Sequence, residues 1–254
     1  MALIRKPFQG TWNIIRFNWH FYALSILSVV ILIGLAGINN AIIHFLAVFL
    51  LFIIIVTTLI SLAVSYYVYD FSDLYKLSWL DKAHFDQNDQ LVNINAGFDE
   101  TSILLNKKFS KCDLSVFDFY DPVKHTEVSI KRARKAYPSF PNTRQISTSS
   151  LPLADNSTDK IFLILSAHEI RDTKERILFF KEVKRILRKN GKIIVTEHLR
   201  DTVNFLAYNI GFFHFHSKST WYKTFHGSGL KVANEIKVTP FITTFILEKD
   251  GNTA

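Results

Sequence analysis

The chain has 254 residues, a formal net charge of +8 and 48% hydrophobic residues, with 23 phenylalanines. A soluble domain is rarely so apolar, so this composition favours a membrane-associated portion. The single cysteine, Cys112, excludes an internal disulfide and any site built from several cysteines. The basic residues are scattered and are not interleaved with stacking aromatics, so we favour an anionic membrane surface over nucleic acid as the partner of this charge.

Two long apolar runs dominate the N-terminal segment, residues 1–69. The first covers about residues 21–38 and the second residues 41–69. Each is close to or above the length of about 20 apolar residues that a helix needs to cross a bilayer. Only a short uncharged turn separates them, so the pattern predicts a transmembrane helical hairpin. A cleaved signal peptide fits less well, because the first run begins late and another follows at once.

The flanking charges predict how this hairpin is oriented. Positive residues stand on both outer flanks and none stands in the turn: Arg5, Lys6, Arg16, Lys76 and Lys82. Since positive charge collects on the cytoplasmic side, we expect an integral membrane protein with both termini and the following domain in the cytoplasm. Residues 70–88 are typical of an amphipathic connector, which is suited to lying along the lipid headgroups.

Strands alternate with helices from residue 89 to the C-terminus at 254. The predicted helices cover residues 102–109, 123–136 and 174–188. The predicted strands are residues 91–94, 114–118, 144–147, 161–166, 192–197, 231–238 and 241–249. The alternation predicts an α/β domain with a mainly parallel sheet, and the last two strands, separated only by a short turn, predict an antiparallel pair.

Two features near the start of this domain are suited to a nucleoside ligand. In LVNINAGFDETS, Gly97 allows a ligand to approach the backbone closely, and Asp99 or Thr101 can cap the helix that follows. The second strand ends at Asp118, about 20 residues beyond this turn, where an acid can bind ribose hydroxyls. An ordinary strand-to-helix turn and a helix-start acid are the structural alternatives.

Polar residues also follow the two central strands. His168 and Glu169 come after the strand at 161–166, and His198 follows the strand at 192–197. The carboxyl ends of parallel strands line the ligand site of an open α/β sheet. We predict His168 as the catalytic base for a phenol or enol, with Glu169 orienting it or acting in its place, and His198 as the second candidate. A helix cap or a supporting hydrogen bond is the alternative for each.

Two further histidines, His214 and His216, alternate in FFHFHSKS. Such spacing can serve a metal ion, but a third ligand is missing at a suitable distance in the sequence. The sequence therefore predicts no metal site.

The order of these segments resembles the class I S-adenosylmethionine-dependent methyltransferases, especially the branch that acts on quinones and other lipophilic small molecules. NINAGFDETS resembles their glycine loop and FDFYDP their ribose-binding acid. The later matches are LPLADNSTDKIFLILSAHEIRD, FFKEVKRILRKNGKIIVTEHLRD and the closing VTPFITTFILEKD. The resemblance covers about residues 89–250. It implies a Rossmann-like, seven-stranded, mostly parallel sheet with a terminal antiparallel strand, and S-adenosyl-L-methionine as cofactor.

The resemblance also assigns cofactor contacts residue by residue. They are Asn93, Asn95, Ala96, Gly97 and Asp99 in the loop, Asp118 at the ribose, Phe119 beside the adenine, Ser147 and Thr148 in the adenine-side loop, and Ser166 beneath the reactive methyl group. The loop departs from the family pattern of an acid followed by three alternating glycines, because only Gly97 keeps a glycine. Ser147 stands where an acid is common.

We therefore predict a membrane-anchored methyltransferase that acts on a lipophilic small molecule, such as a phenolic, quinone-like, polyene or lipid acceptor drawn from the bilayer. The apolar segment at 205–225 can line the acceptor pocket or enter the membrane interface. The alternative is a catalytically degenerate, methyltransferase-like scaffold or binding subunit of a biosynthetic complex. We expect no nucleic-acid partner, and homo-oligomers or biosynthetic partner proteins remain open.

Overall fold

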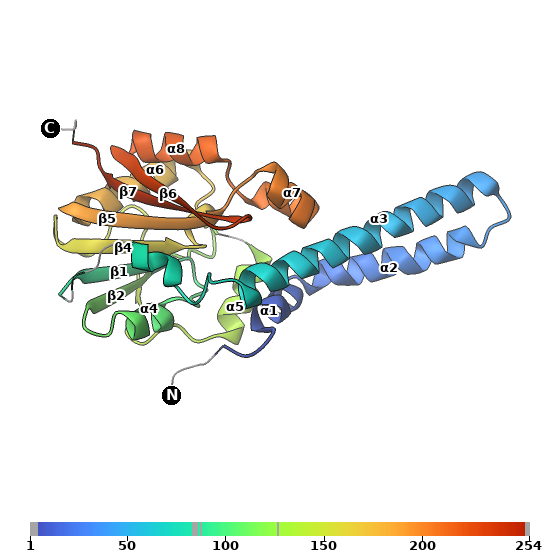
Figure 1. The fold of residues 1–254 in the computed structure, drawn as a ribbon, viewed down its shortest axis with the longest axis horizontal. Coiled ribbons are helices and arrows are strands. Elements are labelled where there is room, and N and C mark those ends of the chain that lie inside the picture. The colour runs from blue at the N-terminus through green and yellow to red at the C-terminus, as the bar shows by residue number, and fades with distance from the viewer. Residues whose placement is uncertain (1–4, 83–85, 87, 126, 252–254) are drawn as a thin grey trace.

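The computed structural model describes residues 5–82, 86, 88–125 and 127–251. The parts of the predicted segments at 1–4, 83–85, 87, 126 and 252–254 lie outside the described residues. The chain forms a long helical arm and an α/β domain, and the arm projects from one side of the domain (Figure 1).

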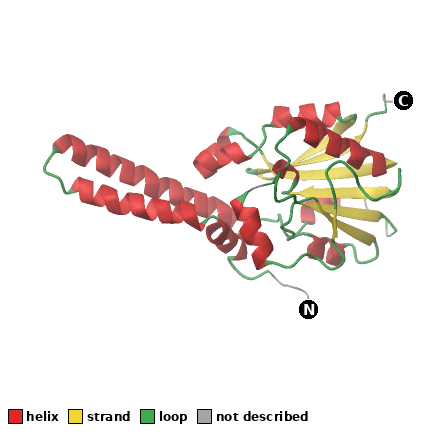
Figure 2. Ribbon diagram, turned by 180° about the vertical axis from the view of Figure 1, so that it is seen from behind, coloured by secondary structure: helices red, strands yellow, loops and turns green. Residues whose placement is uncertain are grey.

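The arm is a hairpin of two antiparallel helices (Figures 1 and 2). It comprises α2 (Trp19–Ala36) and α3 (Ala41–Tyr66), with the short α1 (Gln9–Phe17) before it and a π-helical turn, η1 (Tyr67–Phe71), after it. Asn40 caps α3, because its side chain accepts hydrogen bonds from the amides of Ile42 (3.0 Å) and Ile43 (3.2 Å). Most apolar side chains of the arm are exposed. By length and composition, both helices can cross a membrane.

A seven-stranded sheet in the order β3-β2-β1-β4-β5-β7-β6 forms the centre of the domain. Its strands are β1 (Gln90–Asn95), β2 (Asp113–Asp118), β3 (Arg144–Gln145), β4 (Thr158–Ile164), β5 (Leu187–His198), β6 (Leu230–Thr239) and β7 (Ile242–Lys249). The first five strands pair in parallel, whereas β7 runs antiparallel to both β5 and β6. The predicted mostly parallel sheet with a terminal antiparallel strand is confirmed.

Helices and short turns cover the sheet (Figure 2). They are η2 (Ser78–Lys82), α4 (Ser102–Lys108), α5 (Val128–Ala136), η3 (Ala167–Glu169), α6 (Thr173–Ile186), α7 (Thr202–Tyr208), η4 (Asn209–His214) and α8 (Lys218–Gly227). The larger core cluster joins α6 and α8 to the sheet through side chains such as Phe179, Phe180 and Phe225, all at most 1% exposed. Burial of such side chains stabilises each by about 1.5–3 kcal/mol, so this cluster fixes the sheet that carries the site.

The segment between the arm and the sheet differs from the amphipathic connector that the sequence favoured. Leu77, Trp79 and Leu80 are buried with Phe162 and Ile194 in a second core cluster. These three side chains therefore cover a face of the sheet, whereas Phe71 at the start of the segment is 64% exposed. Sequence periodicity could not separate these two environments, because both bury the same apolar stripe.

The junction of α6 and β5 also differs in detail. The predicted helix extends to residue 188, but α6 ends at Ile186 and the strand begins at Leu187. Leu187 pairs with Thr158 of β4, and the carbonyl of Ile186 accepts the Ser157 amide at 2.9 Å. Pairing with β4 therefore places Leu187 and Arg188 in a strand, although the sequence pattern predicts that the helix continues to residue 188.

Candidate active site

Every predicted site residue lies at the carboxyl ends of the parallel strands or in the turn that follows. Asn95 of β1 is the register partner of Asp118 of β2, so the loop that follows β1 lies beside Asp118. Ser166 follows β4, His168 and Glu169 form the single turn η3, and His198 ends β5. The sheet topology thus brings together a cofactor half, formed by β1 to β3, and an acceptor half, formed by β4 and β5.

The loop after β1 is held by its own polar side chains. Asn93 donates to the hydroxyls of Thr101 (3.0 Å) and Ser102 (2.8 Å). Asp99 accepts the amides of Thr101 (3.0 Å) and Ser102 (2.9 Å), and therefore caps the start of α4. Gly97 has a φ of +92°, which a side chain rarely permits. The one glycine that this chain retains thus stands where the loop requires one.

Polar atoms of this loop are left available for a ligand. Asn95 uses its Oδ1 to accept the Gly97 amide at 2.9 Å. Its Nδ2, and the Oδ2 of Asp99, are buried without a hydrogen-bond partner among the described residues. Buried polar atoms usually have partners, so these two indicate an absent ligand. The donor fits the carboxylate of an amino acid and the acceptor fits its ammonium group, both of which S-adenosyl-L-methionine carries.

Asp118 is paired with an arginine that the sequence did not single out. The carboxylate accepts the Tyr120 amide at 2.8 Å through Oδ1 and forms an ion pair with Arg134 of α5 through Oδ2. A Cβ built on Gly97 would lie 2.5 Å from Nη1 of Arg134, so this guanidinium also fills the space above the loop. A ribose can reach Asp118 only after Arg134 moves.

A cavity of about 240 Å³ begins at Phe119, next to Asp118, where the resemblance expects the adenine. It is lined by Phe119, Tyr120, Asp121, Pro122, Lys124, His125, Gln145, Ile146, Ser147, Thr148 and Glu175. It therefore unites the predicted adenine-side residues Phe119, Ser147 and Thr148. The volume is below the range of about 300–1,000 Å³ for whole small-molecule pockets, so it accommodates one end of a cofactor.

His125 gives this cavity an unused donor. Its Nδ1 accepts the Asp121 amide at 2.9 Å, so the neutral ring carries its proton on Nε2. Burial lowers the pKa of His125 and keeps the ring neutral. Nε2 is buried without a partner among the described residues, and an acceptor nitrogen of an adenine ring suits it. Sequence reasoning missed His125 and Arg134, because neither lies in a motif that points to a cofactor, and it assigned no role to Tyr120 although this residue lies within FDFYDP.

Ala96 and Phe119 support the site from below. Both are buried in the larger core cluster. The Phe119 ring packs against Phe179 of α6, with ring centroids 5.4 Å apart. Thr148 donates to Glu175 at 2.5 Å, which anchors the adenine-side loop to α6. Beneath the expected methyl position, Ser166 donates to the carbonyl of Ile94 at 2.9 Å.

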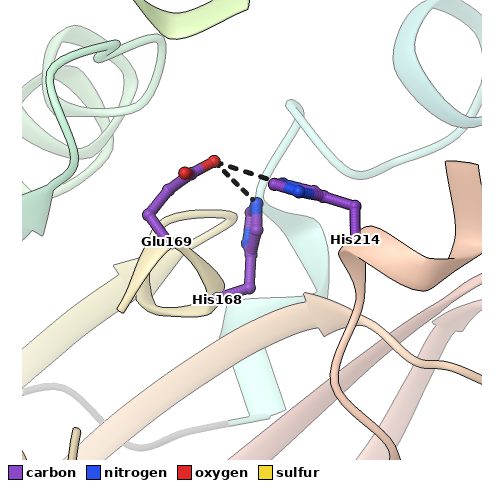
Figure 3. A group of neighbouring side chains, drawn as sticks. All are labelled: His168, Glu169 and His214. Atoms are coloured by element: carbon purple, nitrogen blue, oxygen red, sulfur yellow. Dashed lines mark ion pairs between the residues drawn. The ribbon is translucent and has the colours of Figure 1, made fainter. Parts of the chain in front are cut away.

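The acceptor half contains a dense cluster of histidines and carboxylates. His168 Nδ1 lies 2.6 Å from Oε2 of Glu197, and its Nε2 lies 3.3 Å from Oε1 of Glu169. His214 Nε2 lies 3.3 Å from the same Glu169 oxygen (Figure 3). Its Nδ1 lies 3.2 Å from Oε1 of Glu127. The sequence identified His168 and Glu169 but missed Glu197 and Glu127. The fold brings these groups together from four separate segments.

The charges of this cluster are strongly coupled. Burial disfavours the charged form of His168, but Glu197 and Glu169 outweigh it and raise the pKa of His168 to about 10. Burial likewise opposes the charge of Glu169, yet hydrogen bonds to His168 and His214 lower the pKa of Glu169. The cluster is therefore a compact, ionised array at the end of β4.

His198, the second base candidate, has a different environment. Its Nδ1 donates to Oδ1 of Asn204 at 3.0 Å, and its Nε2 accepts from the hydroxyl of Tyr69 at 2.8 Å. Burial lowers the pKa of His198 to about 4, so the ring is neutral at neutral pH. The Phe215 ring stacks on it at 4.7 Å between centroids.

The helical arm is tied to the cofactor loop through Glu100. This carboxylate accepts from Arg5 (2.8 Å), from Asn13 of α1 (3.3 Å) and from the hydroxyl of Tyr75 (2.7 Å). Asp70, in the turn that ends α3, accepts from the amide of Gly10 at 2.7 Å. The base of the arm and the loop after β1 thus form one polar network, which the sequence did not predict.

Comparison with known proteins agrees with this geometry. Residues 120–195 match the family described as Methyltransferase domain. No curated protein matches the chain.

Several solved structures share this fold, and some of them are described as methyltransferases. A SAM-dependent methyltransferase from Aquifex aeolicus is 15% identical, with 69% of this chain and 89% of that chain covered and a TM-score of 0.50. A chain of the complex between the Haloferax volcanii Trm112 methyltransferase activator and the putative methyltransferase is 12% identical, with 72% and 91% covered and a TM-score of 0.51. The PH0226 protein from Pyrococcus horikoshii is 16% identical, with 68% and 87% covered and a TM-score of 0.50.

The match to the methyltransferase domain over residues 120–195 and the shared fold agree with the resemblance to class I S-adenosylmethionine-dependent methyltransferases. S-adenosyl-L-methionine is the cofactor of that class. The adenine-side cavity, the unpartnered atoms of Asn95, Asp99 and His125, and the buried Asp118 fit this cofactor, provided that Arg134 leaves Asp118.

Proposed function

We propose that this protein is a membrane-anchored methyltransferase that transfers a methyl group to a lipophilic small-molecule acceptor, such as a phenolic, quinone-like, polyene or lipid molecule. The observation that carries the proposal is the direct contact between the arm and the acceptor half. Tyr69, in the turn that continues α3, holds the ring of His198 through a 2.8 Å hydrogen bond. An apolar molecule that travels along the arm would arrive beside the predicted catalytic residues.

The elements around this contact support an apolar route. Helix α7 packs against α3, and α7 lies beside the inner end of the arm (Figure 1). Large apolar side chains of α7 and η4 are exposed: Val203, Phe205, Leu206, Ile210 and Phe213. Contiguous exposed apolar surface marks a membrane or ligand contact. These side chains extend the apolar surface of the arm toward the acceptor half.

The residues divide the chemical work between the two halves. S-adenosyl-L-methionine supplies a methyl group on a sulfonium sulfur, which is a good leaving group, so the protein has to align the acceptor and manage its proton. Asp118, Asn95 and Asp99 would hold the cofactor. His168 and Glu169 would hold the acceptor oxygen and share its proton, and His198 would support them from β5.

The test is methyl transfer by membranes that contain the full chain. Membranes with and without the protein are incubated with S-adenosyl-L-methionine labelled in its methyl group, and lipids are then extracted. We expect label in an organic-soluble small molecule only when the protein is present. Label confined to protein or to water-soluble products would contradict the lipophilic acceptor.

We propose a cytoplasmic location for both termini and for the domain. Positive residues flank the arm on the domain side, whereas the turn at 37–40 carries no charge. Introducing a single cysteine at Asn39 in a Cys112→Ser background tests this in whole cells. A membrane-impermeant thiol reagent should label the variant from outside; labelling only after lysis would reverse the orientation.

A non-catalytic scaffold is the second candidate, and one observation favours it. Arg134 forms an ion pair with Asp118, whose carboxylate a ribose would need. The loop after β1 also retains only Gly97 of the glycines usual in the family. Titration of the full chain in detergent with S-adenosyl-L-methionine separates the two functions. Absence of binding up to millimolar cofactor would establish the scaffold, whereas micromolar binding supports the enzyme.

A further inference from the structure

We propose that His168, Glu169 and His214 form a binding site for one divalent transition-metal ion at the acceptor half. This inference deepens the proposed function and rests on it for the role of the ion, although the site itself follows from the geometry of the three side chains. The ligand atoms of these residues all lie within 4.8 Å of one another. Their side chains converge from η3 and from the end of η4 (Figure 3).

The distances between the three side chains are compatible with a bound ion. Nε2 of His168 and Nε2 of His214 are each 3.3 Å from the same oxygen of Glu169, so both rings direct this nitrogen at one carboxylate oxygen. Ligands that lie about 2.1 Å from a common metal in tetrahedral or octahedral geometry are about 3.0–3.4 Å apart. The two nitrogen–oxygen separations match this spacing, and all three ligand atoms lie within 4.8 Å of one another, so a small approach of the two rings would let them share an ion.

Each histidine also has the support that metal-binding imidazoles need. Nδ1 of His168 faces Glu197 at 2.6 Å, and Nδ1 of His214 faces Glu127 at 3.2 Å. A carboxylate at one ring nitrogen fixes the proton there and leaves the lone pair of the other nitrogen free for a metal. Both Nε2 atoms are the ones that turn toward Glu169, so the two rings are oriented as paired ligands.

The charge balance of the cluster calls for cations. The side chains of Glu169 and Glu197 are only 4% and 1% exposed, and within residues 127–251 their ion-pair partners are the two imidazoles. The neighbouring guanidinium of Arg171 instead donates to the carbonyls of His214 and Phe213. Buried carboxylates without a compensating charge are costly, and a divalent ion that displaces the ring protons would supply that charge in place of the imidazolium.

The donor set indicates the class of ion and its use. Two imidazoles and one carboxylate suit Zn²⁺, Fe²⁺, Co²⁺ or Mn²⁺, and three protein ligands leave coordination positions open. His168 and His214 are 12% and 27% exposed, so the site is open to a small molecule on one side. An acceptor oxygen bound there would lose its proton more easily, because the ion stabilises the resulting anion.

His216, the partner of His214 in the alternating pair, does not join this site. Its Nε2 lies 3.0 Å from a guanidinium nitrogen of Arg176, and the ring is buried beside Trp221. The alternating pair therefore contributes only His214, and the other two ligands come from η3, far away in the sequence. Local spacing could not reveal it.

The test is Co²⁺ binding to the untagged full chain in detergent after removal of metals by a chelator. We expect one Co²⁺ per chain with a visible absorption band from nitrogen ligands, and competition by Zn²⁺. His214→Ala should abolish the band. Glu127→Gln should weaken binding about 10-fold to 100-fold, because the oriented imidazole is lost. His226→Ala, at an exposed position in α8, is the matched control.

Circular dichroism confirms that each variant is folded, and methyl transfer is measured in parallel. Retained Co²⁺ binding in folded His214→Ala, or no binding by the folded parent chain at millimolar Co²⁺, would overturn the site. Loss of the metal with unchanged methyl transfer would refute its role and leave the proposed function standing. Metal binding without methyl transfer to any extracted lipid would refute the proposed function and leave the site standing.

Discussion

The cofactor half and the acceptor half of the same sheet edge satisfy their polar groups in different ways. In the cofactor half, side chains such as Asn93 and Asp99 bond to the loop and to the start of α4, and single atoms remain unpartnered. In the acceptor half, His168 and Glu169 bond to other ionisable side chains. The first arrangement leaves places for a ligand, whereas the second is an interlocked network. Substitutions should therefore alter cofactor affinity in one half and turnover in the other.

The largest effect is expected for His168→Gln in the acceptor half. Removing a group that positions the acceptor and shares its proton should lower turnover about 10²-fold to 10⁴-fold. Cofactor affinity should stay within about twofold, because no contact of the loop after β1 is changed. Turnover is measured with labelled cofactor, and affinity by calorimetry, with His226→Gln as control. Full turnover in the variant would remove His168 from catalysis.

The next effect is expected for Asp118→Asn in the cofactor half. A charge-assisted hydrogen bond contributes about 1.5–3 kcal/mol, so loss of the charge should weaken cofactor binding about 10-fold to 100-fold. Turnover at saturating cofactor should change little. The matched control is Asp113→Asn, an exposed acid at the opposite end of β2. Equal affinity in both variants would place the ribose elsewhere.

Arg134→Met should act in the opposite direction. The guanidinium and the cofactor compete for Asp118, so its removal should tighten cofactor binding about 3-fold to 10-fold. The free energy of unfolding of the cofactor-free protein should fall by about 1–3 kcal/mol, because a buried carboxylate loses its cation and the pair is partly exposed. Calorimetry and chemical denaturation measure the two effects, with Lys135→Met on the same helix as control. Weaker cofactor binding would show that Arg134 assists the cofactor.

The contrast between the halves also explains what the sequence could predict. The fold, the seven strands and the paired terminal strands follow from periodicity and turn residues, which act locally. Asp118 and His168 could be named because Asp118 ends a predicted strand and His168 comes shortly after one. The predicted ends of strands were sufficient to place both residues at one edge of the sheet.

The partners of those residues could not be predicted, because they come from other elements. Glu127 and His214 reach the acceptor half from segments on either side of α6, and Arg134 reaches Asp118 from α5. Their positions depend on how the helices pack over the sheet, which no local pattern encodes. The prediction of no metal site depended on local spacing alone, so it could not consider that His168 and Glu169 lie beside His214 in the fold.

The smallest effect is expected for Tyr69→Phe, which removes a hydrogen bond between the arm and the acceptor half. The variant keeps the ring and removes only the hydroxyl that donates to Nε2 of His198. An unpaired nitrogen in a buried ring costs about 1–3 kcal/mol, part of which a water molecule can recover, so we expect turnover with a lipophilic acceptor to fall about 2-fold to 5-fold. Cofactor affinity should be unchanged, because Tyr69 has no contact with Asn95, Asp99 or Asp118. Turnover in membranes is compared with Tyr67→Phe, a partly exposed tyrosine two residues earlier. If both variants are equally active, the contact holds the arm in place without serving the acceptor.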